Sequence, residues 1–242
     1  MPVKRLAFLV ILAWASFVVP VFSESTTAPQ VTKTYVAEGE VDLLQLLPPA
    51  PLSDSAVTKQ EIQELLRWQA ARTPDQVAFA QADANITVFR FADTLGPTFT
   101  PENLPFLDKF FQSCVANVGL LTNAAKVFYH RPRPYVVDPA IHPVVPKPGN
   151  DSYPSGHSTE GHFFAIVLAD MVPEKAAELH ARGDRFALNR VIGGVHYPTD
   201  IEAGKLSAIV IAERLFTSAE FRNDFEKARR ELRKVLNLPD TL

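Results

Sequence analysis

Three groups of residues along this chain carry side chains that could bind an anion and transfer it. One is the stretch 151–157, Asp-Ser-Tyr-Pro-Ser-Gly-His, which sets Ser155, Gly156 and His157 directly before a helical run. At the start of a helix, unpaired backbone N–H groups and the positive end of the dipole face one spot, which suits phosphate. His157 would then stand beside the anion with a proton to give or take. Taken alone, the stretch fits a surface turn with a helix cap equally well.

The other two groups lie on either side of this stretch. Six residues separate Lys126 from Arg133, close to two helical turns, so both side chains can project to the same side. Arg190 is followed after five residues by His196, and after three more by Asp200. Singly, these residues could be solvated helix positions, a loop histidine and a helix-dipole partner. Together, three cations, two histidines and two helix starts suit the binding and transfer of a trianionic tetrahedral group.

The elements that must position these groups are helical. The spacing of apolar residues predicts an all-α fold, a single-domain bundle of about eight helices, with no internal repeat and no strand pair. Residues 58–61 form a capping-box pattern that opens a helix to about Arg72, and residues 73–76 open another. Residues 85–89 have weak β character, but they are isolated, so a helix or a loop fits as well.

The helices that precede and follow the turn are marked by prolines and glycines. Thr100 and Pro101 are predicted to open a helical run, with a second segment that follows through Val127. Pro132 and Pro134 end it, and a proline-rich loop over residues 135–153 follows. These prolines therefore place Arg133 at the end of a helix.

Beyond His157, we expect a helix over residues 158–172, which Pro173 breaks. Gly183 is predicted to end a short helix, and Asp184 to cap another that reaches about Ile192. An apolar helix over residues 201–216 and a last helix opened by residues 217–220 complete the bundle; Tyr197, Pro198, Thr199 and Asp200 start the first of these.

The first residues of the 242-residue chain have the pattern of a secretory signal. Lys4 and Arg5 precede an apolar run over residues 6–21, and Ser23 offers a small residue for cleavage. A membrane anchor is the alternative, although the run is short for a membrane span. We expect a signal peptide over residues 1–23, an extended lead-in over 24–57, and a helical domain over 58–242. The mature protein, of about 219 residues (242 minus 23), would be soluble and either periplasmic or secreted.

Composition argues against several kinds of partner. A net charge of -3 and a pI near 6.1 disfavour nucleic-acid binding, which usually needs a basic surplus. Cys114 is the single cysteine, which precludes an intramolecular disulfide, and its apolar helical setting predicts a buried filler. No metal site is predicted, because the chain has no HExxH pattern and four histidines lack any partner pattern: His130, His142, His162 and His180.

The three groups in this order resemble the signature of the phosphatidic acid phosphatase type 2 and vanadium haloperoxidase superfamily. Its parts are Lys126-x6-Arg133-Pro134, then Pro-Ser-Gly-His at 154–157, then Arg190-x5-His196-x3-Asp200. Within that superfamily, residues 46–49, 152–157 and 190–196 resemble the bacterial class A non-specific acid phosphatases. Three spaced motifs in order are strong evidence, whereas one alone would be weak. The chain departs from the family pattern at Asn189, usually serine, and at Asp151, often glycine.

The resemblance implies an exported acid phosphatase of broad specificity that works through a phosphohistidine. His196 would attack phosphorus, Asp200 would hold the other ring nitrogen, and His157 would serve as general acid and then as base. The equatorial oxygens would be neutralised by five phosphate-binding residues: Lys126, Arg133, Ser155, Gly156 through its N–H, and Arg190. Asn189 could hydrogen-bond to a phosphate oxygen or orient a neighbour, and Asp151 adds negative charge near the entrance.

Further expectations follow from the same resemblance. The partners would be small phosphate monoesters, with no cofactor, no metal, no nucleic acid and no membrane after signal cleavage. Assembly as a homo-oligomer is expected, and transfer to alcohols could accompany hydrolysis. The alternatives are a vanadate-dependent haloperoxidase, which would typically be longer, a lipid phosphate phosphatase, which would have membrane spans, and a non-catalytic helical binding module.

Overall fold

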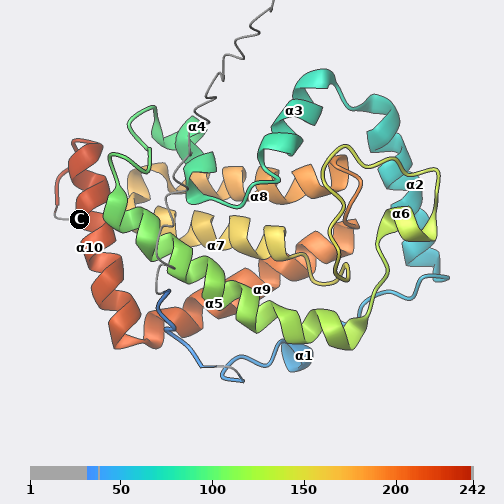
Figure 1. Ribbon diagram of the computed structural model, residues 1–242, viewed down its shortest axis with the longest axis horizontal. Helices are drawn as coiled ribbons and strands as arrows, with labels where there is room; N and C mark the ends of the chain where they lie inside the picture. Colours follow the sequence, from blue (N-terminus) through green and yellow to red (C-terminus); the bar gives the residue numbers. More distant parts are fainter. Residues whose placement is uncertain (1–31, 38, 241–242) are drawn as a thin grey trace, which may run out of the picture. The chain divides into compact units, whose positions relative to one another are not determined.

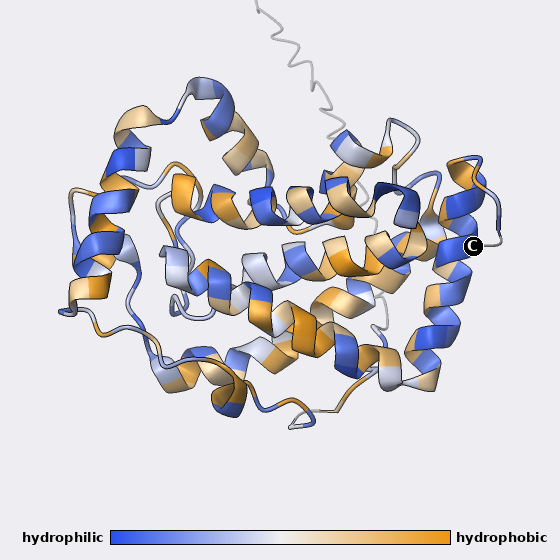
Figure 2. Cartoon of the chain, turned by 180° about the vertical axis from the view of Figure 1, so that it is seen from behind, coloured by the Kyte–Doolittle hydropathy of each residue, from blue (hydrophilic) through white to orange (hydrophobic). Residues whose placement is uncertain are grey.

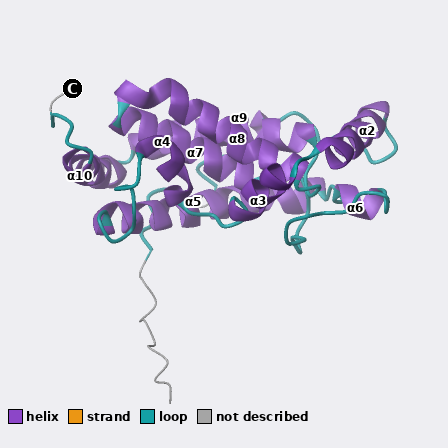
Figure 3. Ribbon diagram, turned by 90° about the horizontal axis from the view of Figure 1, so that it is seen from above, coloured by secondary structure: helices purple, strands orange, loops and turns teal. Residues whose placement is uncertain are grey.

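A computed structural model describes residues 32–37 and 39–240, and the predicted signal peptide lies outside them. Figures 1 and 3 show helices and loops over these residues, without a strand, so the all-α prediction is confirmed. None of the helices described is both long and apolar enough to cross a membrane. The elements in chain order are α1 (Leu43–Leu46), α2 (Ala56–Ala71), α3 (Pro74–Ala82), the 3-10 helix η1 (Val88–Phe91), α4 (Ala92–Leu95), α5 (Pro105–Tyr129), α6 (Pro134–Val137), α7 (Gly156–Met171), the 3-10 helix η2 (Pro173–Lys175), α8 (Ala176–Ile192), α9 (Pro198–Thr217) and α10 (Ala219–Val235).

Helix α7 is the central element of the bundle, and α5, α8 and α9 surround it (Figure 1). Twelve of its sixteen residues are buried, as expected for a helix that is apolar on most sides. Helix α10 packs across α5 and α9, and it is largely hydrophilic with hydrophobic residues along one side (Figure 2). Its buried positions include Phe221, Phe225, Ala228 and Leu232.

A single helix, α8, runs through Gly183, so the predicted break there is wrong. A Cβ atom at Gly183 would lie 2.8 Å from Cβ of Ala165 and 3.2 Å from the carbonyl oxygen of Gly161. The glycine therefore allows α8 to approach α7 closely and does not end a helix. Asp184 lies inside α8 and therefore caps no helix. Its carboxylate is instead 3.0 Å from Nε2 of His162 and 2.6 Å from Nζ of Lys205.

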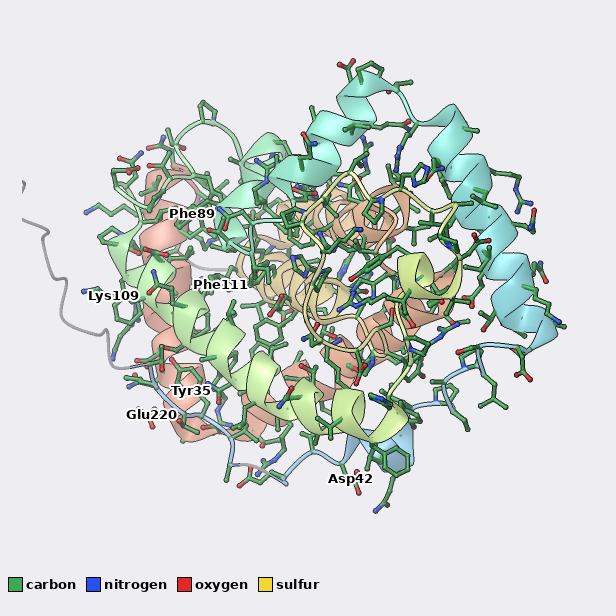
Figure 4. The ribbon with its side chains drawn as sticks, turned by 45° about the vertical axis from the view of Figure 1, so that its right-hand side comes forward. Tyr35, Asp42, Phe89, Lys109, Phe111 and Glu220 are labelled. Atoms are coloured by element: carbon green, nitrogen blue, oxygen red, sulfur yellow. The ribbon has the colours of Figure 1, made fainter. Side chains whose placement is uncertain are left out.

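The predicted start of α5 is also wrong. The helix begins at Pro105, not at Thr100, and it continues without interruption to Tyr129. Proline suits the first helical position, because an N–H group there has no partner within the helix and its absence costs no hydrogen bond. Helix α5 therefore spans both predicted segments, and Figure 4 shows Phe111 directed from it toward the interior while Lys109 points outward. Cys114 is fully buried on the same helix, which confirms its prediction as a core residue.

Three other helix starts were predicted from capping patterns. The Thr73 hydroxyl caps α3 by accepting from the Gln76 N–H, and the Gln76 side chain accepts from the Thr73 N–H. These two bonds confirm the capping box predicted at residues 73–76. Helix α2 is capped by Ser55, not by Thr58, because the Ser55 hydroxyl accepts from the Thr58 N–H at 3.2 Å. Similarly, Ser218 caps α10 in place of Thr217. Each error moves a boundary by one to three residues, where neighbouring hydroxyl residues compete for the cap.

The described part of the lead-in packs against α5 and α10. The backbone N–H groups of Tyr35 and Val36 donate to Oδ1 of Asn117 on α5. Lys33 forms an ion pair with Asp224 on α10, and Figure 4 shows Tyr35 beside the same helix. This segment therefore contributes side chains to the core, since both Tyr35 and Val36 are buried.

Candidate active site

All three predicted groups contribute to one cavity at the N-terminal end of α7. The cavity has a volume of ≈ 240 Å³, and its lining includes five predicted residues as well as the unpredicted carboxylic acid Glu160. The predicted lining residues are Lys126, Arg133, Gly156, His157 and His196. Three further predicted residues, Ser155, Arg190 and Asp200, are fully buried nearby and contact or face members of that lining.

Helix ends bring these residues together. Lys126 lies in the last turn of α5, Arg133 directly precedes α6, and His196 lies in the connection between α8 and α9. The start of α9 lies close to the start of α7, because the Ser155 N–H donates to the main-chain oxygen of Asp200 at 3.0 Å. In the second turn of α9, a Cβ atom at Gly204 would lie 2.7 Å from the Ser155 carbonyl oxygen, so glycine allows this close approach.

His196 presents an unprotonated nitrogen. Its Nδ1 lies 3.1 Å from Oδ2 of Asp200, and because a carboxylate accepts hydrogen bonds, Nδ1 carries the proton. Nε2 therefore keeps its lone pair, which accepts from Nη1 of Arg133 at 2.7 Å. Burial, and then the nearby Arg133, hold the pKa of His196 well below its usual range. The ring is neutral and has the tautomer of a nucleophile.

Asp200 is held by several donors besides His196. The Ser152 hydroxyl donates to its carboxylate at 2.5 Å, the Tyr197 N–H at 2.9 Å, and Nη1 of Arg131 at 2.7 Å. Asp200 is also the third residue of α9, so its charge faces the positive end of that helix. These bonds fix the carboxylate, and through it the orientation of the His196 ring.

Arg131 is a part of this site that the sequence analysis missed. Its other nitrogen, Nη2, lies 2.7 Å from Oε2 of Glu61, and its guanidinium lies 3.9 Å from the centre of the Tyr197 ring. Arg131 thus links two buried carboxylates, on α2 and α9. The repeated dipeptide Arg131-Pro132-Arg133-Pro134 was the available signal, but only its second arginine fitted the motif.

His157 is neutral in this arrangement. Its Nε2 lies 3.0 Å from the carbonyl oxygen of Ala84, which can only accept, so Nε2 carries the proton and Nδ1 is deprotonated. Burial lowers the pKa of His157 to about 3, and the cations Arg190, Arg133 and Lys126 act in the same direction. His157 can therefore take up a proton only if negative charge enters the cavity.

The cations are held in different ways. Nζ of Lys126 donates to the carbonyl oxygens of Pro154 and Asp151 at 2.5 and 3.0 Å, and burial lowers its pKa to about 8. Arg133 donates to Asn150 and to main-chain oxygens around it. Arg190 is different, because its Nε and Nη1 are buried without a hydrogen-bond partner. Buried donors of this kind are costly unless a ligand satisfies them, so Arg190 is suited to bind an anion.

Ser155 and Gly156 form the first turn of α7. The Ser155 hydroxyl accepts from the Ser158 N–H at 3.2 Å and so serves as the helix cap. Gly156 is the first helical residue, and its lack of a side chain keeps the backbone accessible to the cavity. The start of α7 therefore offers N–H groups and a positive dipole end to an anion.

The two departures from the family pattern have different surroundings. The Asn189 side chain donates from Nδ2 to Asp83 at 2.7 Å. Asp83 also pairs with Arg182 at 2.7 Å, so Asn189 belongs to a buried polar cluster that ties α8 to the loop after α3. The Asp151 carboxylate lies 2.8 Å from Nδ1 of His130, and the main-chain oxygen of Asp151 accepts from Lys126.

Comparisons with known proteins identify the family of this chain. The family model described as PAP2 superfamily matches residues 110–224, which include all three motifs. The non-specific acid phosphatase of Salmonella typhimurium is 30% identical over 229 residues, which cover 90% of this chain and 91% of that protein. The acid phosphatase of Zymomonas mobilis is 30% identical over 231 residues, 91% of this chain and 87% of that protein.

Two solved structures share the fold. A bacterial vanadium-dependent iodoperoxidase superimposes with a TM-score of 0.54 at 19% identity, over 71% of this chain and 51% of that one, so this chain spans about half of its length. A transmembrane PAP2-type phosphatidylglycerolphosphate phosphatase from Bacillus subtilis gives a TM-score of 0.50 at 17% identity, over 67% and 86% of the two chains. At these identities the likeness concerns the helical architecture.

Proposed function

Because this chain belongs to the PAP2 superfamily and is an acid phosphatase, we propose that it hydrolyses phosphate monoesters of broad specificity through a phosphohistidine at His196. One observation carries the proposal: a neutral His196, with its Nδ1 proton held by Asp200 and a lone pair on Nε2, lines one cavity together with the cations Lys126 and Arg133. This arrangement combines an activated nucleophile with charge compensation for a tetrahedral anion.

In the first step the phosphate group binds at the start of α7. Lys126, Arg133 and Arg190, together with the Gly156 N–H, neutralise its non-bridging oxygens. Arg133 gives up its bond to His196 for a phosphate oxygen, which frees Nε2. The Nε2–P bond then forms while the bond from phosphorus to the ester oxygen breaks.

His157 supplies the proton for the leaving alkoxide. The incoming dianion offsets the cations that lower its pKa, so binding favours the protonated ring. Since Nε2 is bonded to Ala84, Nδ1 is the atom that takes up and donates the proton. In the second step neutral His157 accepts a proton from water, the water oxygen bonds to phosphorus, and the P–Nε2 bond breaks. An alcohol in place of water would give transfer.

The decisive experiment traps the intermediate. Brief mixing of the purified protein with a labelled phosphate monoester, quenched under alkaline conditions, should leave phosphate on His196. His196→Ala should abolish both the label and turnover. Phosphate on Ser155 would refute the assignment, since its hydroxyl is the other candidate nucleophile at the start of α7.

We also propose that the protein is exported, with cleavage after Ser23, and forms a homo-oligomer. Large hydrophobic side chains stay exposed along the end of α5 and on α6: Val127 is 70%, Phe128 66% and Val136 65% exposed. Contact between copies would remove them from water. The intact mass of the exported protein would test the cleavage, and light scattering would test the assembly. A retained residue 1 or a monomer would contradict the respective proposal.

A further inference from the structure

Glu160 lines the phosphate cavity, although neither the motif nor the mechanism above uses it. It lies on α7, one helical turn after His157. Its side chain is almost completely buried, and Oε2 has no hydrogen-bond partner. A buried carboxyl oxygen without a partner is costly, so a polar ligand in the cavity would stabilise it.

Charged groups on two other helices act on Glu160. Lys126 reaches it from α5 and Arg190 from α8, and both favour the ionised form. Burial outweighs both cations, however, and raises the pKa of Glu160 to about 8. In acidic and neutral solution the carboxyl group is therefore protonated, and it has an O–H donor to offer.

We propose that protonated Glu160 is a phosphate-binding residue that donates a hydrogen bond to a non-bridging oxygen, and that its ionisation expels phosphate from the cavity. This proposal rests on the proposed function of the cavity. A neutral acid adds a donor without competing for the cations, as its carboxylate would. Once ionised, the carboxylate would instead repel the phosphate dianion, and it would offset part of the positive charge of Lys126 and Arg190.

Glu160 would thereby determine the pH range in which substrate binds. Phosphate and the Glu160 carboxylate are two anions that one small cavity cannot hold together, so phosphate binding and protonation of Glu160 should be coupled. The acid form of the protein would be the binding-competent form. The alkaline limit of activity would then be set within the cavity.

Other titratable groups face the same space, and the test must separate them from Glu160. His157 and His196 are already neutral above pH 6, and Arg190, with a pKa of about 10, stays charged to near that value. Arg133 keeps its charge as well. Two groups besides Glu160 still couple phosphate binding to pH. Bound phosphate favours the protonated form of His157, and Lys126 has a pKa of about 8, so its deprotonation would weaken phosphate binding too. A variant that alters only Glu160 isolates the contribution of the carboxyl group.

The experiment measures inhibition by inorganic phosphate between pH 6 and pH 9. Hydrolysis of p-nitrophenyl phosphate provides the assay for wild type and for Glu160→Gln, in which the amide keeps the donor and cannot ionise. With a pKa of about 8, Glu160 should weaken phosphate binding about tenfold at pH 9. The ratio of inhibition constants at pH 9 and pH 6 should therefore be about tenfold larger in wild type. Glu178→Gln, an equal charge change on the exposed surface of α8, should keep the wild-type ratio.

A second variant tests the hydrogen bond itself. Glu160→Leu has neither donor nor charge, so at pH 6 it should bind phosphate about tenfold more weakly than Glu160→Gln, as expected for one charge-assisted bond. Circular dichroism verifies that both variants fold. Equal pH ratios in wild type and Glu160→Gln, or equal affinity of the two variants at pH 6, would overturn the role of Glu160. Failure of the proposed function looks different, since wild type would then neither hydrolyse the ester nor bind phosphate.

Discussion

Nη1 of Arg133 lies 2.7 Å from Nε2 of His196, so a cation covers the nitrogen that we propose as the nucleophile. Arg133 also donates to Asn150 and to the main-chain oxygen of Val195, which keeps the guanidinium at the cavity wall. A phosphate that draws Nη1 to its own oxygen would uncover the lone pair. Arg133 thereby couples binding of the anion to exposure of the nucleophilic nitrogen.

Replacement of Arg133 tests this coupling. Arg133→Ala should lower kcat/KM by about 10²-fold or more, because a donor to the transition state is lost. The variant should also raise the pKa of His196, since a neighbouring cation that lowers it is removed. Steady-state kinetics over a range of pH measures both effects. Arg67→Ala, on the exposed face of α2, is the control, and equal kinetics of the two variants would contradict the role of Arg133.

Arg131 should contribute more to the unfolding free energy than Arg133. Arg131→Met leaves the buried carboxylates of Glu61 and Asp200 without their shared partner. Loss of one partner from a buried pair typically costs about 3–5 kcal/mol of unfolding free energy. Urea denaturation should show this loss, and a smaller one for Arg133→Ala, because Arg133 borders the cavity. Similar stabilities of Arg131→Met and wild type would contradict the linking role.

Activity should not depend on a divalent metal. Three side-chain cations and the N–H groups of α7 supply the charge compensation that a metal would otherwise provide. Dialysis against EDTA should leave the hydrolysis of p-nitrophenyl phosphate unchanged, whereas vanadate and inorganic phosphate should inhibit it. Loss of activity on dialysis, with recovery on addition of zinc or magnesium, would contradict this expectation.

The residues of the cavity that could be predicted from the sequence are those at the ends of helices. Lys126, Arg133, His157 and His196 occur at short, regular distances from a proline or glycine that ends or opens a helix. Local chain geometry therefore predicts that they lie at helix ends, and their joint occurrence at the spacing of the family motifs predicts that they form one site. Helical class and core followed in the same way from apolar spacing.

The residues that could not be predicted depend on contacts between distant segments. Glu160 belongs to none of the three motifs, and its place in the cavity results from the approach of α5 to α7. Gly183 has the local pattern of a helix end, but its neighbour is Ala165 on another helix. Asn189 directly precedes Arg190 in the sequence, yet its side chain donates to Asp83, more than a hundred residues away in the sequence.

The pH dependence of stability provides an independent view of Glu160. Its pKa is about 8 in the folded protein and 4.5 in the unfolded chain. The folded state thus binds the proton more tightly, and this contribution is full below pH 4.5 and declines as pH rises to about 8. Without phosphate in the buffer, the unfolding free energy of wild type relative to that of Glu160→Gln should fall over this range by up to about 5 kcal/mol. The difference removes the contributions of the buried histidines, which both proteins share. Parallel profiles of unfolding free energy against pH would contradict the assignment.

The proposed roles of the two histidines can be separated by the leaving group. A general acid matters most when the departing alkoxide is a poor leaving group, and little when it is already stable. His157→Ala should therefore slow the hydrolysis of glycerol phosphate by about 10²-fold or more, and that of p-nitrophenyl phosphate much less. His196→Ala should slow both alike, because the nucleophile is lost. Equal losses for the two esters in His157→Ala, with chemistry shown to be rate-limiting, would mean that His157 binds phosphate and does not donate the proton.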